Sequence, residues 1–352
     1  MQYKYQKKIL KYKIICIERF WLNIMKEQVK RRSKRRKNRA AEAGIAAVLS
    51  AVVVIGGIYA FAGSESGRRR GKVPSLVMEY AQPEIDLSGL NSRAGILVRL
   101  SDGQVIARQR QDEKIFPASL TKIMTCIIAL ETIDDLEAEI SMPEDIFPPL
   151  YADNASMAGF LPGEHVKIMD LLYGIILPSG GECSAAAAEY AAGSQEAFVK
   201  LMNEKAQELG MDNTHFENVT GLHDENHYTT VSDLAVLLEY ALRNDTFEQI
   251  FSSKEHFVSP TDGHPEGLML KSSMFILEQD WTVGRGEIRG GKTGYTDQSG
   301  LCLATEAMLG NEKYIAVTAG AEGNHSTEPY HVLDAFYLYD QVENLWQVTK
   351  DE

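Results

Sequence analysis

The order in which hydrophobic periods change along the chain is the strongest constraint on its fold. Period-two patterns, which are typical of strands, occur in two separate parts of the chain, and a helical pattern fills the part between them. The expected strands are 94–100, 105–108, 287–293, 299–306 and 313–319. This order excludes a βαβ alternation. It predicts an α+β fold in which both chain ends contribute to one antiparallel sheet that helices cover.

Local signals at the ends of the segments support this interpretation. Asp102-Gly103 predicts a hairpin turn between the first two strands. Gly210 is placed to end one helix, and Ser232 is a candidate N-cap for another. The expected helices are 119–131, 166–177, 184–192, 195–209, 233–242 and a closing amphipathic helix at 328–348.

Charge is distributed unevenly along the 352 residues. Residues 1–39 hold 15 of the 36 Lys and Arg side chains but only two acids, whereas the part from Val73 onward has 17 basic and 45 acidic residues. Binding to nucleic acid requires clustered Lys and Arg on the folded surface, so the acidic body argues against a nucleic-acid partner. The acidic side chains of this body are most simply interpreted as a solvent-exposed surface.

Residues 43–64 form an uncharged run of 22 residues between Glu42 and Glu65. As a helix this run would be about 33 Å long, enough to cross a hydrocarbon core of about 30 Å. The stronger basic cluster lies before the run, which places the N-terminus in the cytoplasm and the body outside the membrane. Ala60-Phe61-Ala62 also has the form of a signal-peptidase site, so the domain would be secreted if the chain were cleaved after Ala62.

Four segments follow from these patterns. We expect a basic cytoplasmic head at 1–42, a transmembrane anchor or signal segment at 43–64, a linker at 65–84, and a folded domain at 85–349. Met25, which is followed by its own basic run, is an alternative start of translation.

The cysteines and histidines predict no metal site. Cys16, Cys126, Cys183 and Cys302 match no metal-binding spacing, and we expect thiols that pack as small hydrophobic side chains. His223 and His227 are four residues apart, but the zinc-protease pattern requires Glu directly after the first His, where this chain has Asp224.

Ser119 and Lys122 have a spacing that suits nucleophilic catalysis. On a helix, residues three apart share a face, so the lysine amine can reach the serine hydroxyl. A lysine that burial keeps neutral can remove the hydroxyl proton, and the helix N-terminus favours developing negative charge. For the pair alone, a capping serine followed by an ordinary surface lysine is the better interpretation.

Two further triplets make catalysis the better interpretation. Lys292-Thr293-Gly294 ends a predicted strand, where Lys and Thr can hold a carboxylate and Gly leaves room for a substrate backbone. Ser179-Gly180-Gly181 lies in the turn after an apolar helix. Tyr295 directly follows the first triplet and is expected either at the rim of a cleft or in plain sheet packing.

With these motifs, the chain resembles the low-molecular-mass penicillin-binding proteins, the serine-type D-alanyl-D-alanine carboxypeptidases of peptidase family S11. The resemblance covers about residues 85–345. Four blocks carry it: FPASLTKIMT at 116–125, LLYGIILPSG at 171–180, TGLHDENHYTT at 220–230 and GGKTGYTDQSGLCLA at 290–304.

The resemblance implies a β-lactamase/transpeptidase-like fold, with a five-stranded antiparallel sheet, helices on both of its faces and an α-helical subdomain, here preceded by one transmembrane helix. It implies that Ser119 is acylated, that Lys122 acts as the base, and that Ser179 relays a proton to the leaving D-alanine. Lys292 and Thr293 would bind the terminal carboxylate beside Gly294, and the backbone N–H groups of Ser119 and Tyr295 would form the oxyanion hole.

The implied substrates are peptidoglycan stem peptides, with β-lactams as covalent inhibitors and no metal or organic cofactor. Gly181 departs from the family pattern, which has Asn at that position. This departure leaves a weakly active or inactive pseudoenzyme that binds β-lactams or the cell wall as one alternative, and a D,D-endopeptidase is another. A class A β-lactamase is disfavoured, because the nearest approach to its Glu-x-x-Leu-Asn element has Arg243 in the last position.

Overall fold

A computed structural model describes residue 85 and residues 87–278 and 280–348. These residues belong to one compact unit, Lys72–Glu352. The predicted head, membrane segment and linker at 1–84 lie outside the described residues. Within the described part, no helix combines the length and the apolar character that crossing a membrane requires.

A six-stranded antiparallel sheet has the order β2-β1-β10-β9-β8-β7. Its strands are β1 (Ala94–Arg99), β2 (Gln104–Gln109), β7 (Thr282–Val283), β8 (Gly286–Thr296), β9 (Gly300–Leu309) and β10 (Glu312–Ala321). All five predicted strands are present, and the first hairpin pairs through β1 with the last strand, β10. The predicted total of five was wrong, because β7 adds a sixth strand of two residues, too short to show a period.

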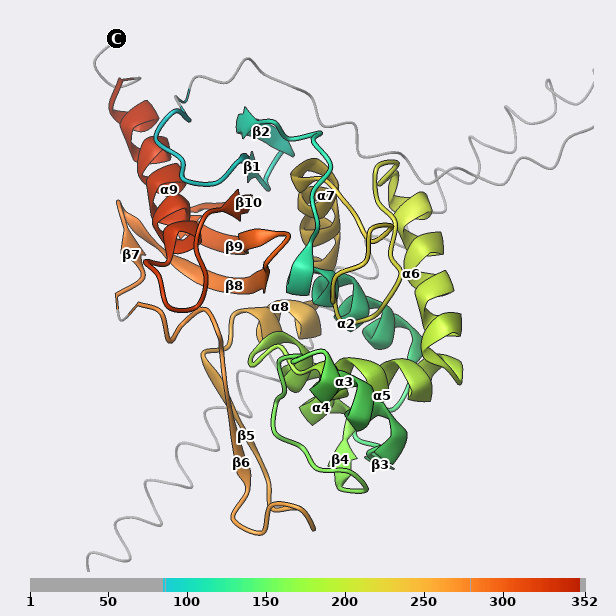
Figure 1. Ribbon diagram of the computed structural model, residues 1–352. Coiled ribbons are helices and arrows are strands. Elements are labelled where there is room, and N and C mark those ends of the chain that lie inside the picture. The colour runs from blue at the N-terminus through green and yellow to red at the C-terminus, as the bar shows by residue number, and fades with distance from the viewer. Residues whose placement is uncertain (1–84, 86, 279, 349–352) are drawn as a thin grey trace, which may run out of the picture. The chain divides into compact units, whose positions relative to one another are not determined.

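Both faces of the sheet are covered, as predicted. In β10, Ile315 and Val317 belong to a core shared with the helices of the central part of the chain. The alternate residues Tyr314 and Ala316 pack on the other side with α9 (Tyr330–Val348). In Figure 1, α9 lies along one face of the sheet and α7 (Val231–Ala241) along the other.

The rest of the chain forms a mainly helical part around α2 (Thr121–Thr132), whose first nine residues are all buried. Two small antiparallel sheets of two strands each, β3 with β4 and β5 with β6, complete this part, and the one formed by β5 and β6 extends away from the main sheet in Figure 1. The further elements are η1 (Ala118–Leu120), β3 (Glu139–Ser141), η2 (Glu144–Ile146), α3 (Phe147–Ala152), β4 (His165–Lys167), α4 (Ile168–Ile176), α5 (Gly181–Ala192), α6 (Gln195–Leu209), α8 (Asp245–Phe251), β5 (Glu255–Val258) and β6 (Leu268–Lys271).

Helix α6 has the predicted bounds, and Gly210 ends it with a left-handed φ of 76°. Other boundaries differ from prediction. The helix predicted from 166 begins at Ile168 because 165–167 pair as β4, and α5 begins at Gly181 rather than at 184. The cap of α7 is Thr230, whose side chain accepts a hydrogen bond from Asp233 N at 3.0 Å, so the predicted cap at Ser232 was wrong.

Candidate active site

Ser119 lies in the short 3-10 turn η1, directly before α2. Ala118 has a left-handed φ of 47°, and its carbonyl accepts a hydrogen bond from Thr121 Oγ1 at 2.8 Å. Gly221 closes over this turn so tightly that a Cβ atom there would lie 1.8 Å from Ala118 O. A Cβ on Gly294 of β8 would be 3.1 Å from Pro117 O. Close backbone packing from two sides therefore fixes the position of Ser119.

The predicted proximity of Lys122 to Ser119 is present. Lys122 Nζ lies 3.2 Å from Ser119 Oγ and donates a hydrogen bond to Thr220 O at 2.6 Å. The side chain is buried, and burial lowers the pKa of Lys122 to about 8, although the negative charge of Glu182 acts in the opposite direction. A substantial fraction of this amine is therefore neutral near physiological pH, as a base requires.

The side chain of His227 supports the turn that carries Ser119. Its Nδ1 accepts a hydrogen bond from Glu217 N at 3.1 Å, so its Nε2 carries the proton and donates to Thr121 Oγ1 at 2.8 Å. Burial lowers the pKa of His227 to about 4, which keeps the ring neutral. Both ring nitrogens are thus used in structural hydrogen bonds. Among the described residues, no group of three His, Cys, Asp or Glu side chains is arranged to hold a metal ion.

Lys292 of β8 is fully buried, and its Nζ donates to Thr293 O at 2.9 Å. Burial and the positive charge of nearby Lys122 hold the pKa of Lys292 well below its ordinary value. Thr293 Oγ1 shares a hydrogen bond of 2.6 Å with Ser273 Oγ, and Ser273 N donates to Leu177 O at 2.8 Å. Ser273 therefore connects β8 to the segment that leads into Ser179.

Ser179 has a left-handed φ of 67°, and its buried Oγ has no hydrogen-bond partner in the part of the chain that the structure describes. The following turn packs tightly, because a Cβ on Gly181 would lie 3.1 Å from Leu150 Cδ2 and 3.3 Å from Ala155 Cβ. Glu182 is also buried, and its Oε1 accepts hydrogen bonds from the backbone N–H groups of residues 158 and 159. Burial raises the pKa of the Glu182 carboxyl.

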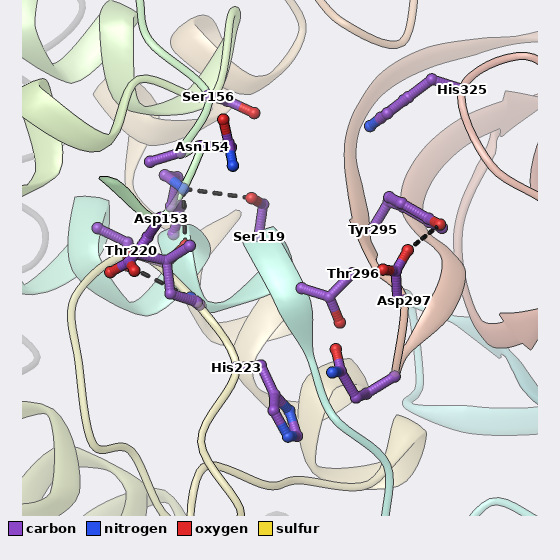
Figure 2. A pocket seen from close by; sticks show the side chains of 15 residues that line it. Ser119, Asp153, Asn154, Ser156, Thr220, His223, Tyr295, Thr296, Asp297 and His325 are labelled. Atoms are coloured by element: carbon purple, nitrogen blue, oxygen red, sulfur yellow. Dashed lines mark hydrogen bonds between the residues drawn. The ribbon is translucent and has the colours of Figure 1, made fainter. Parts of the chain in front are cut away.

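A cleft of about 510 Å³ opens over Ser119 and Lys122 (Figure 2). Its walls come from four parts of the chain: the loop after α3, the segment after Val219, the end of β8 with the turn that follows, and the segment after β10. The lining residues are Ser119, Lys122, Asp153, Asn154, Ala155, Ser156, Thr220, Gly221, Leu222, His223, Tyr295, Thr296, Asp297, Gln298 and His325.

The structure brings only some of the expected site residues to this surface. Tyr295 lines the cleft, where its hydroxyl donates to Asp297 Oδ1 at 2.6 Å and its ring meets His325 edge-on. Ser179 and Lys292 lie beneath the surface rather than in the lining. No signal in the sequence indicated three residues that the structure brings to the site, because none of them stands in a motif: Ser273, which contacts Thr293, and Asn154 and His325, which line the cleft.

A serine within reach of a buried lysine at a helix start, facing the end of a sheet strand that carries a second buried lysine, defines the class of serine acyltransferases that penicillins inhibit. The comparison with known families is more specific. The model of peptidase family S11, described as D-alanyl-D-alanine carboxypeptidase, matches residues 78–323, and the chain belongs to this family.

Two curated relatives are the D-alanyl-D-alanine carboxypeptidases DacF of Bacillus subtilis and DacC of Escherichia coli. DacF is 34% identical over 234 residues, which are 65% of this chain and 57% of DacF. DacC is 33% identical over 250 residues, which are 69% of this chain and 60% of DacC. The chain thus spans somewhat more than half the length of these relatives.

Among solved structures, the Streptomyces K15 DD-transpeptidase matches with a TM-score of 0.65 and 24% identity, covering 73% of this chain and all of that protein. The D-alanyl-D-alanine carboxypeptidase of Mycobacterium tuberculosis matches with a TM-score of 0.62 and 25% identity, covering 74% and 94% of the two chains. These matches support the penicillin-binding, transpeptidase-like α+β fold.

Proposed function

We propose that the protein is a serine D,D-carboxypeptidase that removes the terminal D-alanine from peptidoglycan stem peptides through an acyl-enzyme on Ser119. The observation that carries the proposal is the distance of 3.2 Å between Lys122 Nζ and Ser119 Oγ, combined with a lysine pKa of about 8. A neutral amine at this distance can accept the hydroxyl proton while the oxygen attacks.

In the first step, Ser119 Oγ forms a bond to the carbonyl carbon of the penultimate D-alanine, and its proton passes to Lys122 Nζ. The backbone N–H groups of Ser119 and Tyr295 stabilise the oxyanion. The peptide C–N bond then breaks, and the leaving nitrogen receives a proton through Ser179. In the second step, water attacks the ester, which releases the shortened stem and restores the serine hydroxyl.

Substrate selection depends on the terminal carboxylate. In the proposal, Lys292 and Thr293 bind it, and Gly294 leaves space for the peptide along β8. A free carboxylate stabilises the charged form of Lys292, whose burial otherwise favours the neutral amine. This charge match favours a chain terminus over an internal peptide bond. β-Lactams, which also present a carboxylate beside a reactive carbonyl, would acylate Ser119.

The test uses the full-length protein with diacetyl-L-Lys-D-Ala-D-Ala and measures released D-alanine. We expect release by the wild type and no release by Ser119→Ala. Ser101→Ala changes an exposed serine in the β1–β2 turn and should retain full activity. Labelling of Ser119 by a fluorescent penicillin without any D-alanine release would contradict the proposal and favour a binding pseudoenzyme. Release only from cross-linked peptides would favour an endopeptidase.

We propose in addition that residues 43–64 anchor the enzyme in the bacterial membrane, with the 85–349 domain on the outer side. The uncharged run and the basic residues before it support this topology. We expect the protein to remain in the membrane fraction after alkaline extraction. We also expect protease added to intact spheroplasts to digest the catalytic domain. A soluble form starting at Gly63 would instead indicate cleavage after Ala62.

A further inference from the structure

The loop at 153–156 forms one wall of the cleft and packs against the first turn of α5. Gly181 N donates to Ser156 O at 2.7 Å, and a Cβ on Gly181 would lie 3.3 Å from both Ala155 Cβ and Ser156 O. The start of α5 therefore presents only backbone on this side. The side chains that reach the cleft from this wall come from the loop itself.

Asn154 is held in a defined conformation within this loop. Its φ of 51° is left-handed, and among non-glycine residues asparagine is one of the few that adopt this region readily. Its N–H donates to Tyr151 O at 3.2 Å, and Ala155 N donates to Leu150 O at 2.9 Å, so α3 fixes the backbone on both sides of the Asn154 peptide unit. The fold thus fixes the backbone from which the exposed Asn154 side chain extends.

The side chain of Asn154 points into the cleft beside Ser119 in Figure 2. Within the described part of the chain, its carboxamide has no hydrogen-bond partner. A carboxamide offers two N–H donors and a carbonyl acceptor. Asp153, its neighbour on the same wall, can only accept hydrogen bonds when it is ionised.

The opposite wall indicates which substrate group needs a donor. β7 pairs with β8 only at Gly286 and Glu287, so this edge of β8 has no strand partner near Tyr295 within the described residues. A peptide that pairs with this edge directs one N–H toward it. In a trans peptide unit, N–H and C=O point in opposite directions. The carbonyl of the same unit therefore points toward the loop at 153–156.

We propose that Asn154 is a substrate-binding residue whose Nδ2 donates a hydrogen bond to the carbonyl of the stem residue that precedes the acyl D-alanine. This inference rests on the proposed carboxypeptidase function. Together with the edge of β8, the contact holds the peptide unit next to the scissile bond from both sides. It gives the enzyme an amide contact on a wall where Gly181 has no side chain.

The test compares Asn154→Gly, Asn154→Asp and Asn154→Ala in full-length protein, with Asn311→Gly in the exposed β9–β10 turn as the matched control. Glycine tolerates the left-handed φ and removes the amide, whereas aspartate keeps the shape and removes the donors. We expect all three Asn154 variants to lower kcat/KM for the tripeptide about tenfold, the loss typical of one hydrogen bond. Melting temperatures of the glycine and aspartate variants should be unchanged.

A modified substrate separates direct contact from a structural role. Replacing the carbonyl oxygen of the residue before the acyl D-alanine with sulfur weakens it as an acceptor. This replacement should lower kcat/KM for the wild type about fivefold more than for Asn154→Gly, a coupling that only a direct contact produces. Full activity of Asn154→Gly beside a weak Asn154→Ala, or equal sulfur effects in both enzymes, would overturn the inference. Absence of D-alanine release by the wild type would instead refute the proposed function.

Discussion

Acylation of Ser119 should accelerate steeply between pH 6 and pH 9, because Lys122 must lose its own proton before it can accept one. Burial disfavours the ammonium form and lowers the pKa of Lys122 from 10.5 to about 8. At 1.36 kcal/mol per pH unit, this difference corresponds to about 3 kcal/mol. The neutral fraction is then about 1% at pH 6, about 10% at pH 7 and about 90% at pH 9.

The second-order rate of acylation by a chromogenic β-lactam, measured by stopped flow, should therefore rise about 90-fold from pH 6 to pH 9 and then level off. A lysine with its ordinary pKa would give a rate that still increases about tenfold per pH unit at pH 9. That continued rise, or a rate independent of pH, would refute the assignment of Lys122 as a buried base.

Glu182 provides an internal check, because its negative charge raises the pKa of Lys122. Glu182→Gln retains the oxygen that accepts hydrogen bonds from Ala158 N and Gly159 N but removes the charge. The midpoint of the pH profile should move to lower pH. Glu189→Gln, on the same helix, should leave the midpoint unchanged. Equal midpoints in the wild type, Glu182→Gln and Glu189→Gln would show that Glu182 is uncharged or too distant to change the pKa of Lys122.

Three substitutions test the supports of the site and the core. Ser273→Ala removes the hydrogen bond to Thr293 Oγ1 and should lower kcat/KM for D-alanine release about fivefold with little change in melting temperature; an unchanged value would show that Thr293 is held in another way. Gly221→Ala places a Cβ 1.8 Å from Ala118 O at a φ of 82°, so urea unfolding should show a loss of more than about 2 kcal/mol. Phe198→Ala empties a fully buried site and should cost about 3–5 kcal/mol in the same measurement, whereas a loss below about 1 kcal/mol would contradict the packing.

Hydrophobic periods and helix-end residues predicted the longer helices and strands, because each of these signals comes from residues within or next to the element itself. The alternation in β10 reflects a sheet covered on both faces, and Gly210 ends α6 through its own backbone freedom. Proximity of Ser119 and Lys122 was also predictable, since three residues along a helix fix the spacing. The sixth strand was not predictable, because the two residues of β7 are too few to show a hydrophobic period.

The supports of the site depend on contacts between distant parts of the chain. Ser273 meets Leu177 and Thr293 only after the chain has folded, and no spacing in the sequence indicates those contacts. Asn154 likewise stands in no motif. The substrate contact proposed for it depends on the packing of its loop against Gly181, which the sequence does not indicate. The incorrect prediction of Ser232 as the cap arose because Thr230, two residues earlier, is also a residue type that caps helices, and residue type alone does not decide between the two positions.

The pairing of β1 with β10 has a consequence for the time at which the enzyme becomes reactive. Ala94 pairs with Ala319, so the first hairpin of the domain cannot complete the sheet until its last strand, β10, has been synthesised. Ser119 follows that hairpin in the chain, whereas Lys292 and Tyr295 belong to β8, which is synthesised after the helical part of the domain. In the proposed mechanism, a growing chain therefore holds Ser119 without the strand that would present a substrate, so hydrolysis requires that β8 has already been synthesised.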